Sequence, residues 1–177
     1  MTTKNTNKGF SLIELLIVVA IILIIAAVAV PNLIRAKIAA NQSSAAASLR
    51  TLDSAATTYS NTYQDGYPGS LGVLAPPAAP PATCDTAGLV DGVLATGQKS
   101  GYQFAWQVGA AQVGTTPTGC TAAGYSDMFA VTASPFGFPT GTTYYCVDAS
   151  GVIRESAGAI TATTAGCPSS ALPIGQN

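Results

Sequence analysis

The sequence predicts an α+β fold, in which a long N-terminal helix packs on a small antiparallel β-sheet with disulfide-pinned loops. Three observations lead to this prediction. An apolar run fills residues 12–30, an apolar stripe at helical spacing continues to Tyr63, and alternating strand patterns begin at Tyr102. The first half of the helix suits a membrane, whereas the remainder of the chain suits one compact head.

The apolar run is long enough to span a bilayer, because about 20 apolar residues cross the hydrocarbon layer. Its single ionisable side chain is Glu14. A carboxylate well inside a bilayer costs on the order of 3 kcal/mol, and less near the interface, so an acid there is a candidate functional group with a partner to be found. We therefore expect a membrane-spanning segment over about residues 11–30, with Glu14 paired.

A nearby partner for this acid is created if the bond between Gly9 and Phe10 is hydrolysed. Phe10 then gains an α-amino group with a reference pKa of about 8, which is largely cationic at neutral pH. Glu14 follows Phe10 by one helical turn, so the two charges can pair within one helix or between two adjacent helices. Cleavage is therefore expected to switch on self-assembly.

The start of the chain resembles the class III signal of type IV pilins and pseudopilins. The residues that carry the resemblance are Lys8-Gly9-Phe10-Ser11-Leu12-Ile13-Glu14-Leu15-Leu16-Ile17-Val18-Val19-Ala20-Ile21. The resemblance implies a type IV pilin-like fold and a prepilin peptidase that removes residues 1–9 after Gly9. It further implies that Phe10 becomes N-methylphenylalanine, that Glu14 is the essential assembly acid, and that Pro31 is the family's proline.

Two positions depart from the family pattern. Leu23 stands where a glycine is common, and Thr51 lies near the place of a second helix proline. A proline inside a helix removes one hydrogen bond, so Pro31 is expected to bend or loosen the helix near Ala27. By resemblance we expect a locally unwound stretch in an assembled filament, and without the glycine we expect it to be short.

Two other interpretations of the N-terminus remain. An ordinary secretory signal could be cut after Ala27-Val28-Ala29, and an ordinary single-pass anchor needs only the apolar run. Both are less favoured. The run exceeds a typical signal core of about 7–15 residues, and neither interpretation explains Glu14.

The composition argues against an enzyme and against nucleic-acid binding. Charged residues make up 8% of the chain, the formal net charge is −1, and histidine is absent. The usual general base and the commonest transition-metal ligand are therefore missing, as is a basic face for phosphates. No phosphate-binding or dinucleotide-binding motif occurs, so no cofactor and no metal is expected. Calcium held by Asp127, Asp148 and Glu155 is less favoured than solvated turn acids.

Four cysteines lie in the part expected outside the membrane, where disulfides persist. Three connectivities are possible. We favour the sequence neighbours, Cys84 with Cys120 and Cys146 with Cys167. Each bridge is expected to stabilise the head by roughly 3 to 4 kcal/mol.

The expected helix and strands follow from the spacing of apolar residues and from the residues that end each segment. Helix is expected from Ser11 to Tyr63, with the stripe Ile34, Ile38, Ala45, Leu49, Leu52, Ala56, Tyr59 and Tyr63. Residues 64–100 are expected to be loop, and the strands to cover residues 102–108, 128–133, 142–147 and 152–155, with an irregular tail over 158–177. The predicted divisions are a leader at 1–9, the helix at 10–63 and the head at 64–177.

The function implied by the resemblance is that of a major pilin, the structural subunit of a type IV pilus, which serves adhesion among other roles. The alternatives are a major pseudopilin of a type II secretion system and a minor pilin. The resemblance implies a homopolymeric filament, processing by prepilin peptidase, residence in the bacterial inner membrane before assembly, and an extracellular pilus afterwards. An assembly ATPase and a platform membrane protein are implied in the same way.

Overall fold

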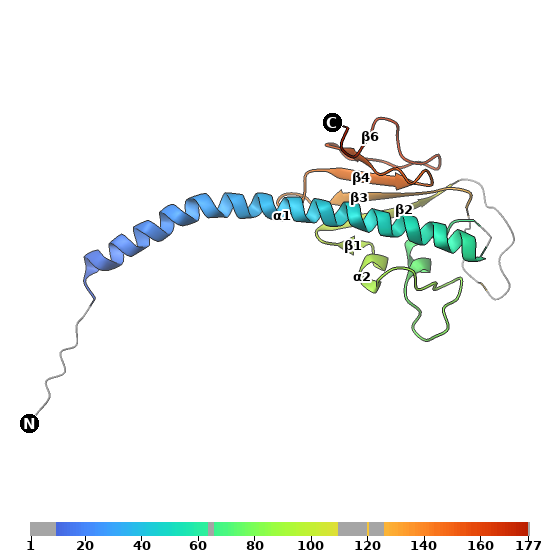
Figure 1. Cartoon of the computed structure of the whole chain (residues 1–177), viewed down its shortest axis with the longest axis horizontal. Helices are drawn as coiled ribbons and strands as arrows, with labels where there is room; N and C mark the ends of the chain where they lie inside the picture. Colours follow the sequence, from blue (N-terminus) through green and yellow to red (C-terminus); the bar gives the residue numbers. More distant parts are fainter. Residues whose placement is uncertain (1–9, 64–65, 110–119, 121–125, 177) are drawn as a thin grey trace, which may run out of the picture. The chain divides into compact units, whose positions relative to one another are not determined.

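The computed structural model of the 177-residue chain describes residues 10–63, 66–109, 120 and 126–176. The chain divides into two compact units, Met1–Lys37 and Ile38–Asn177. We call the second one the head unit. Most of its strands are labelled in Figure 1. The elements in chain order are α1 (Leu12–Tyr63), η1 (Leu71–Leu74), α2 (Gly92–Ala95), β1 (Gln98–Lys99), β2 (Tyr102–Val108), β3 (Phe129–Pro135), β4 (Tyr144–Asp148), β5 (Arg154–Ser156) and β6 (Leu172–Pro173).

Helix α1 confirms the predicted long helix. It contains 52 residues and begins at Leu12, one residue after the expected start. The helix is continuous through Pro31, so the loosening expected near Ala27 does not interrupt it in the single chain. Pro31 has no backbone N–H to donate, and its ring crowds the preceding turn, so the helical hydrogen bonding is weaker there. Unwinding in a filament stays a prediction.

The second part of α1 buries the apolar stripe that the spacing predicted. Leu49, Leu52, Ala56 and Tyr59 are each fully buried, and Tyr63 is partly buried against the same core. Residues three, four and seven apart share one face of a helix, so these side chains form a single contact surface. The rest of the core comes from the sheet and from η1 and α2.

The sheet has six antiparallel strands in sequential order, β1-β2-β3-β4-β5-β6. Strand β3 pairs with β2 from Tyr102↔Pro135 to Val108↔Phe129, and with β4 through Thr132↔Cys146. Phe129 to Ala133 are all buried, as befits an inner strand covered on both faces. Trp106 stacks on Phe129, with ring centroids 5.2 Å apart. The predicted β-sheet is thus confirmed, with two strands more than expected.

The additional elements lie in segments that we expected to be irregular. Residues 64–100 contain η1, α2 and β1, and the tail contains β6, so both loop predictions were wrong in part. These pieces have two to four residues, too few to display a period. Strand β6 tolerates Pro173 because it lies at the sheet edge, where the missing N–H removes no ladder bond.

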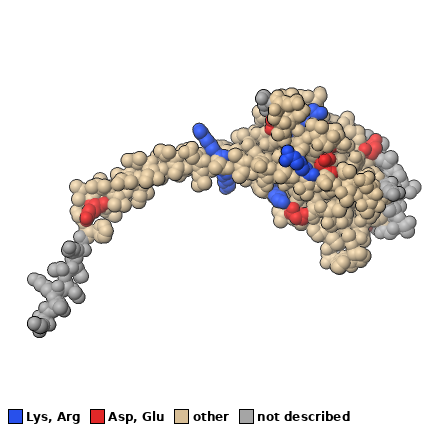
Figure 2. Space-filling model, viewed as in Figure 1, with Lys and Arg blue, Asp and Glu red and all other residues tan. Residues whose placement is uncertain are grey.

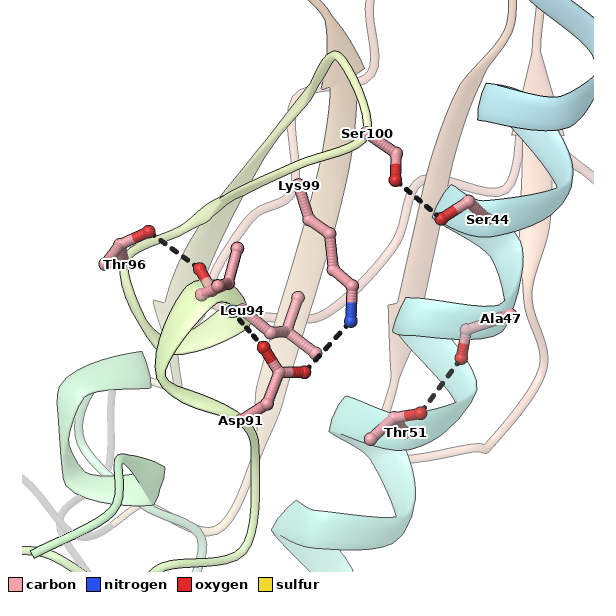
Figure 3. Close-up of polar contacts among 9 residues, drawn as sticks. Ser44, Ala47, Thr51, Asp91, Leu94, Thr96, Lys99 and Ser100 are labelled. Atoms are coloured by element: carbon pink, nitrogen blue, oxygen red, sulfur yellow. Dashed lines mark hydrogen bonds and ion pairs between the residues drawn. The ribbon is translucent and has the colours of Figure 1, made fainter. Parts of the chain in front are cut away.

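A polar network fixes α2 and β1 beside α1 (Figure 3). Asp91 caps α2, accepting a hydrogen bond from the Leu94 amide at 2.9 Å, and it forms a salt bridge with Lys99 at 2.9 Å. These interactions lower the pKa of Asp91, the Leu94 amide most of all. Ser44 of α1 donates to the hydroxyl of Ser100 at 2.9 Å. The short elements are therefore positioned by side-chain bonds rather than by propensity.

Two disulfides close the head unit, and they have the pairing that the sequence analysis favoured. Cys84 is bonded to Cys120, with Cα atoms 5.7 Å apart, and Cys146 to Cys167, with Cα atoms 5.9 Å apart. The first pins the segment after η1, whose Cys84 carbonyl accepts the buried Tyr59 hydroxyl at 2.8 Å. The second ties the tail to β4.

Candidate assembly site

The apolar segment of α1 is not buried by any of the residues that the structure describes. By length and composition it can cross a membrane, and none of its most apolar stretch is buried. Leu16 and Ile17 expose 61% and 53% of their surface. A contiguous apolar surface of this size marks a membrane or protein interaction site. In Figure 2 this segment is free of charge between the acidic side chain near its start and the first basic ones.

Glu14 lies in the first turn of α1 and folds back toward the start of the helix. Its Oε2 accepts a hydrogen bond from the Ser11 amide at 2.9 Å. Ser11 precedes the first helical residue and Glu14 is the third, so the two residues form the backbone half of a capping box. A negative charge there is also favoured by the helix dipole.

This arrangement holds the carboxylate at the N-terminal end of α1, directly after Phe10 and Ser11. Phe10 directly precedes Ser11 and is 88% exposed, so its nitrogen belongs to the helix end toward which Glu14 points. Gly9 lies outside the described residues, and with it the expected cleavage bond.

The sequence analysis missed the capping role of Glu14. The signal was present, because a serine followed three residues later by glutamate immediately before an apolar run marks a helix start. The finding gives Glu14 a structural task in addition to the assembly role expected of it. Pro31, the other expected assembly residue, stands inside α1, and Arg35 and Lys37 follow it as exposed cations.

The acids of the head unit serve its own loops. Asp148 accepts bonds from the Ser150 hydroxyl, from the Ser150 amide at 3.0 Å and from the Cys167 amide at 2.9 Å. Burial raises the pKa of Asp148, but these bonds and the Arg154 charge outweigh it, so the net pKa is lowered. In the described part of the chain, no group of three or more Asp, Glu or Cys side chains could hold a metal ion. The acids considered for calcium do not converge.

Comparisons with known proteins find similar sequences at the N-terminal end of the chain. Residues 4–30 match the family model described as the prokaryotic N-terminal methylation motif. The chain is 49% identical over 53 residues to the "Type IV major pilin protein PilA" of Myxococcus xanthus (strain DK1622). That alignment covers 30% of this chain and 24% of the relative, so the chain spans about a quarter of the relative's length. No solved structure matches the chain significantly.

The matched region contains the features described above, namely the exposed apolar helix, its capped acid and the preceding Phe10. The remainder of the chain supplies the second half of α1, an antiparallel sheet and two disulfides. The N-terminal part of the chain is thus similar to the prokaryotic N-terminal methylation motif and to a type IV major pilin.

Proposed function

We propose that this chain is the major pilin of a type IV pilus, the subunit that polymerises through the N-terminal part of α1 after its leader is removed. The observation that carries the proposal is the apolar segment, which is left uncovered by the described residues and bears one acid at its start. Such a surface is stable in lipid and equally suited to a bundle of like helices.

The proposed processing begins at the bond between Gly9 and Phe10. A prepilin peptidase hydrolyses this bond and methylates the new amine of Phe10. Residues 1–9 are then the leader, residues 10–63 the long helix and residues 64–177 the remainder of the head. Loss of Lys4 and Lys8 with the leader shifts the formal charge from −1 to about −3. The new charge that matters is the Phe10 amine.

Assembly then exchanges lipid contacts for protein contacts. Because lipid tails are as apolar as leucine, this exchange alone gives little free energy, and close packing with specific polar pairs has to supply the rest. The Phe10 amine of one subunit and the Glu14 carboxylate of its neighbour form such a pair. In a low-dielectric filament core, leaving either charge unpaired is costly, so the pair selects the register of adjacent helices.

The proposed location follows from the same scheme. The subunit resides in the inner membrane with its head outside the cytoplasm, and it enters an extracellular filament on assembly. Disulfides of the kind found in the head unit persist in that oxidising compartment. An assembly ATPase and a platform membrane protein are the further partners that this function requires.

The capping role of Glu14 allows a sharp test of its charge. Glu14→Gln keeps an acceptor for the Ser11 amide but removes the charge, whereas Glu14→Ala removes both. Both variants are expected in the membrane at the wild-type level yet absent from sheared surface filaments, as measured by immunoblot of the two fractions. Ser11→Ala, which keeps the Ser11 amide, is the matched control and should assemble.

Filaments of the Glu14→Gln variant at wild-type abundance would contradict the charge pair and leave the cap as the sole role of Glu14. Mass spectrometry of wild-type filaments tests the processing step, since the mature chain should begin at methylated Phe10. Electron microscopy of the sheared material distinguishes a major pilin, whose long fibres consist mainly of this chain, from a pseudopilin or a minor pilin, which is absent or scarce there.

A further inference from the structure

The head unit exposes two different surface features at the two ends of β4. Before the strand, the loop over residues 136–143 presents Phe136 and Phe138, which are 56% and 78% exposed. After the strand, a hollow lies beside Val152 and Ile174, each 38% exposed. We call the first feature the knob (Phe136, Phe138) and the second the hollow. Nothing in the described chain covers either of them.

The knob stands on a well-anchored loop. Asn41 of α1 donates its amide hydrogen to the Thr140 carbonyl at 2.8 Å, and Gln42 donates to the Thr142 and Thr143 hydroxyls at 3.0 and 3.1 Å. Within the loop, the Thr140 amide donates to the Gly137 carbonyl at 2.7 Å. A held loop loses little conformational entropy when its aromatic rings are buried by a partner. This makes the knob suitable as an anchor for binding.

The hollow has a volume of about 360 Å³, enough for an aromatic ring. Its wall is formed by Arg50, Gly151, Val152, Ile153, Pro173 and Ile174. Arg50 is exposed and makes no salt bridge with any described residue. A guanidinium at the edge of the hollow can lie against the face of an aromatic ring, and Val152, Ile153 and Ile174 supply apolar contacts beside it.

Knob and hollow are displaced from each other along α1. The knob loop is held by Asn41 and the hollow is lined by Arg50, nine residues later, which corresponds to about 14 Å along a helix. A contact between two different patches of the same molecule is heterologous, and repetition with a displacement generates an open helix rather than a closed dimer. Copies with parallel helices can meet in this way when one is shifted along the axis by about that distance.

We propose that the knob of one copy of this chain inserts into the hollow of the next copy, with Phe138 against Arg50, as a contact between heads in the filament. The inference rests on the proposed function, because it takes a polymer of this chain as given. A second copy is the occupant because the knob supplies exposed aromatic rings, the hollow supplies a guanidinium with apolar side chains, and the two features are displaced along α1 as an open polymer requires.

Cross-linking in intact filaments tests the contact. All four cysteines are in disulfides, so new ones react selectively. Two double variants are made, Phe138→Cys with Val152→Cys and Phe138→Cys with Ile174→Cys. Their filaments are sheared from the cells and treated with a short bis-maleimide. A ladder of dimers, trimers and longer products is expected on denaturing gels. The matched control is Phe138→Cys with Val93→Cys, whose second site is 60% exposed but lies on α2, and it should give no ladder.

The outcomes separate this inference from the proposed function. Normal filaments without a ladder in both test pairs overturn the contact and leave the polymer intact. A wild-type chain that forms no filaments overturns the proposed function itself. Cross-linked ladders that appear only in membrane fractions, and not in filaments, also overturn the proposed contact between subunits of the filament.

A second measurement does not depend on new cysteines. Phe136→Ser with Phe138→Ser changes two exposed side chains, so folding of the subunit should be unaffected. Filaments of this variant are expected to dissociate at a temperature several degrees below the wild type, and Arg50→Ala should shift it less in the same direction. The control Val93→Ser should leave the dissociation temperature unchanged. An unchanged temperature for the double variant would count against the knob.

Discussion

Leucines in the two parts of helix α1 differ in how much of their surface is exposed. In its first part Leu15 and Leu16 expose 60% and 61% of their surface, whereas in the head unit Leu49 and Leu52 expose none. Both parts are helical and both are apolar on at least one face. The difference lies in what covers them: the sheet covers the second part, whereas none of the residues described in the structure buries the first.

The two parts of α1 differ in what they contribute to the stability of the folded subunit. Burial of apolar surface contributes to folding only when the chain itself provides the cover. The second part of α1 therefore stabilises the folded chain. Under the proposed function, the first part stabilises the contacts with lipid or with neighbouring helices. A substitution should affect one property or the other according to its position along a single helix.

The largest expected effect comes from Leu52→Ala compared with Leu16→Ala. Leu52 is fully buried, so its truncation should lower the free energy of unfolding by roughly 2 to 5 kcal/mol through lost transfer energy and a cavity. Leu16→Ala should leave it unchanged. The measurement is denaturant unfolding of the detergent-solubilised chain, followed by fluorescence of Trp106, the single tryptophan, which stacks on Phe129 in the head.

Filament abundance should show the reverse order for variants that remain folded. Leu16→Ala is expected to reduce sheared filament, because it removes packing surface from the proposed core. Equal loss of unfolding free energy in both variants would contradict the division of α1 into two parts with separate tasks.

The next effect concerns the disulfides, which are confined to the head unit. Replacing Cys146 and Cys167 together by alanine should lower the free energy of unfolding by roughly 3 kcal/mol, because a loop closed over 21 residues is released in the unfolded chain. The same change at Cys84 and Cys120, which are 36 residues apart, should cost slightly more by chain entropy. Unfolding in the same tryptophan assay measures both, and equality with wild type would contradict a stabilising role.

Sequence reasoning was strongest where a period extends over many residues. The 52-residue α1 and the seven-residue β2 were predicted within one residue at each end, because their patterns repeat often enough to be recognised. It failed at η1, α2 and β6, which are held by tertiary contacts such as the pairing of Glu155 with Leu172. The Glu14 cap was readable from local sequence, whereas the hollow beside Arg50 was not, since its walls are up to 124 positions apart, from Arg50 to Ile174.

A smaller effect is expected from Asp148→Asn. One amide nitrogen would replace a carboxylate oxygen and face an N–H donor, from either Ser150 or Cys167, so at least one hydrogen bond is lost. A loss of roughly 1 to 2 kcal/mol follows at neutral pH. The pKa of Asp148 is lowered in the folded chain, so its contribution is present above the usual value of 3.8 and is lost as the pH falls through the folded pKa. Wild type and variant should therefore converge in acid, and a difference that persists there would contradict this account.

The smallest effect, with the opposite sign, is expected from Asp53→Asn. Burial and the neighbouring Asp148 charge raise the pKa of Asp53, so its ionised form disfavours the folded chain. The contribution of Asp53 is therefore most favourable below 3.8 and is lost as the pH rises through the folded pKa. Asp53→Asn should be slightly more stable than wild type at neutral pH and equal to it in strong acid. In the Asp148→Asn background, the stability gained by Asp53→Asn should be smaller, because only the burial contribution remains. An unchanged gain in stability there would show that the two carboxylates do not interact across α1 and the turn after β4.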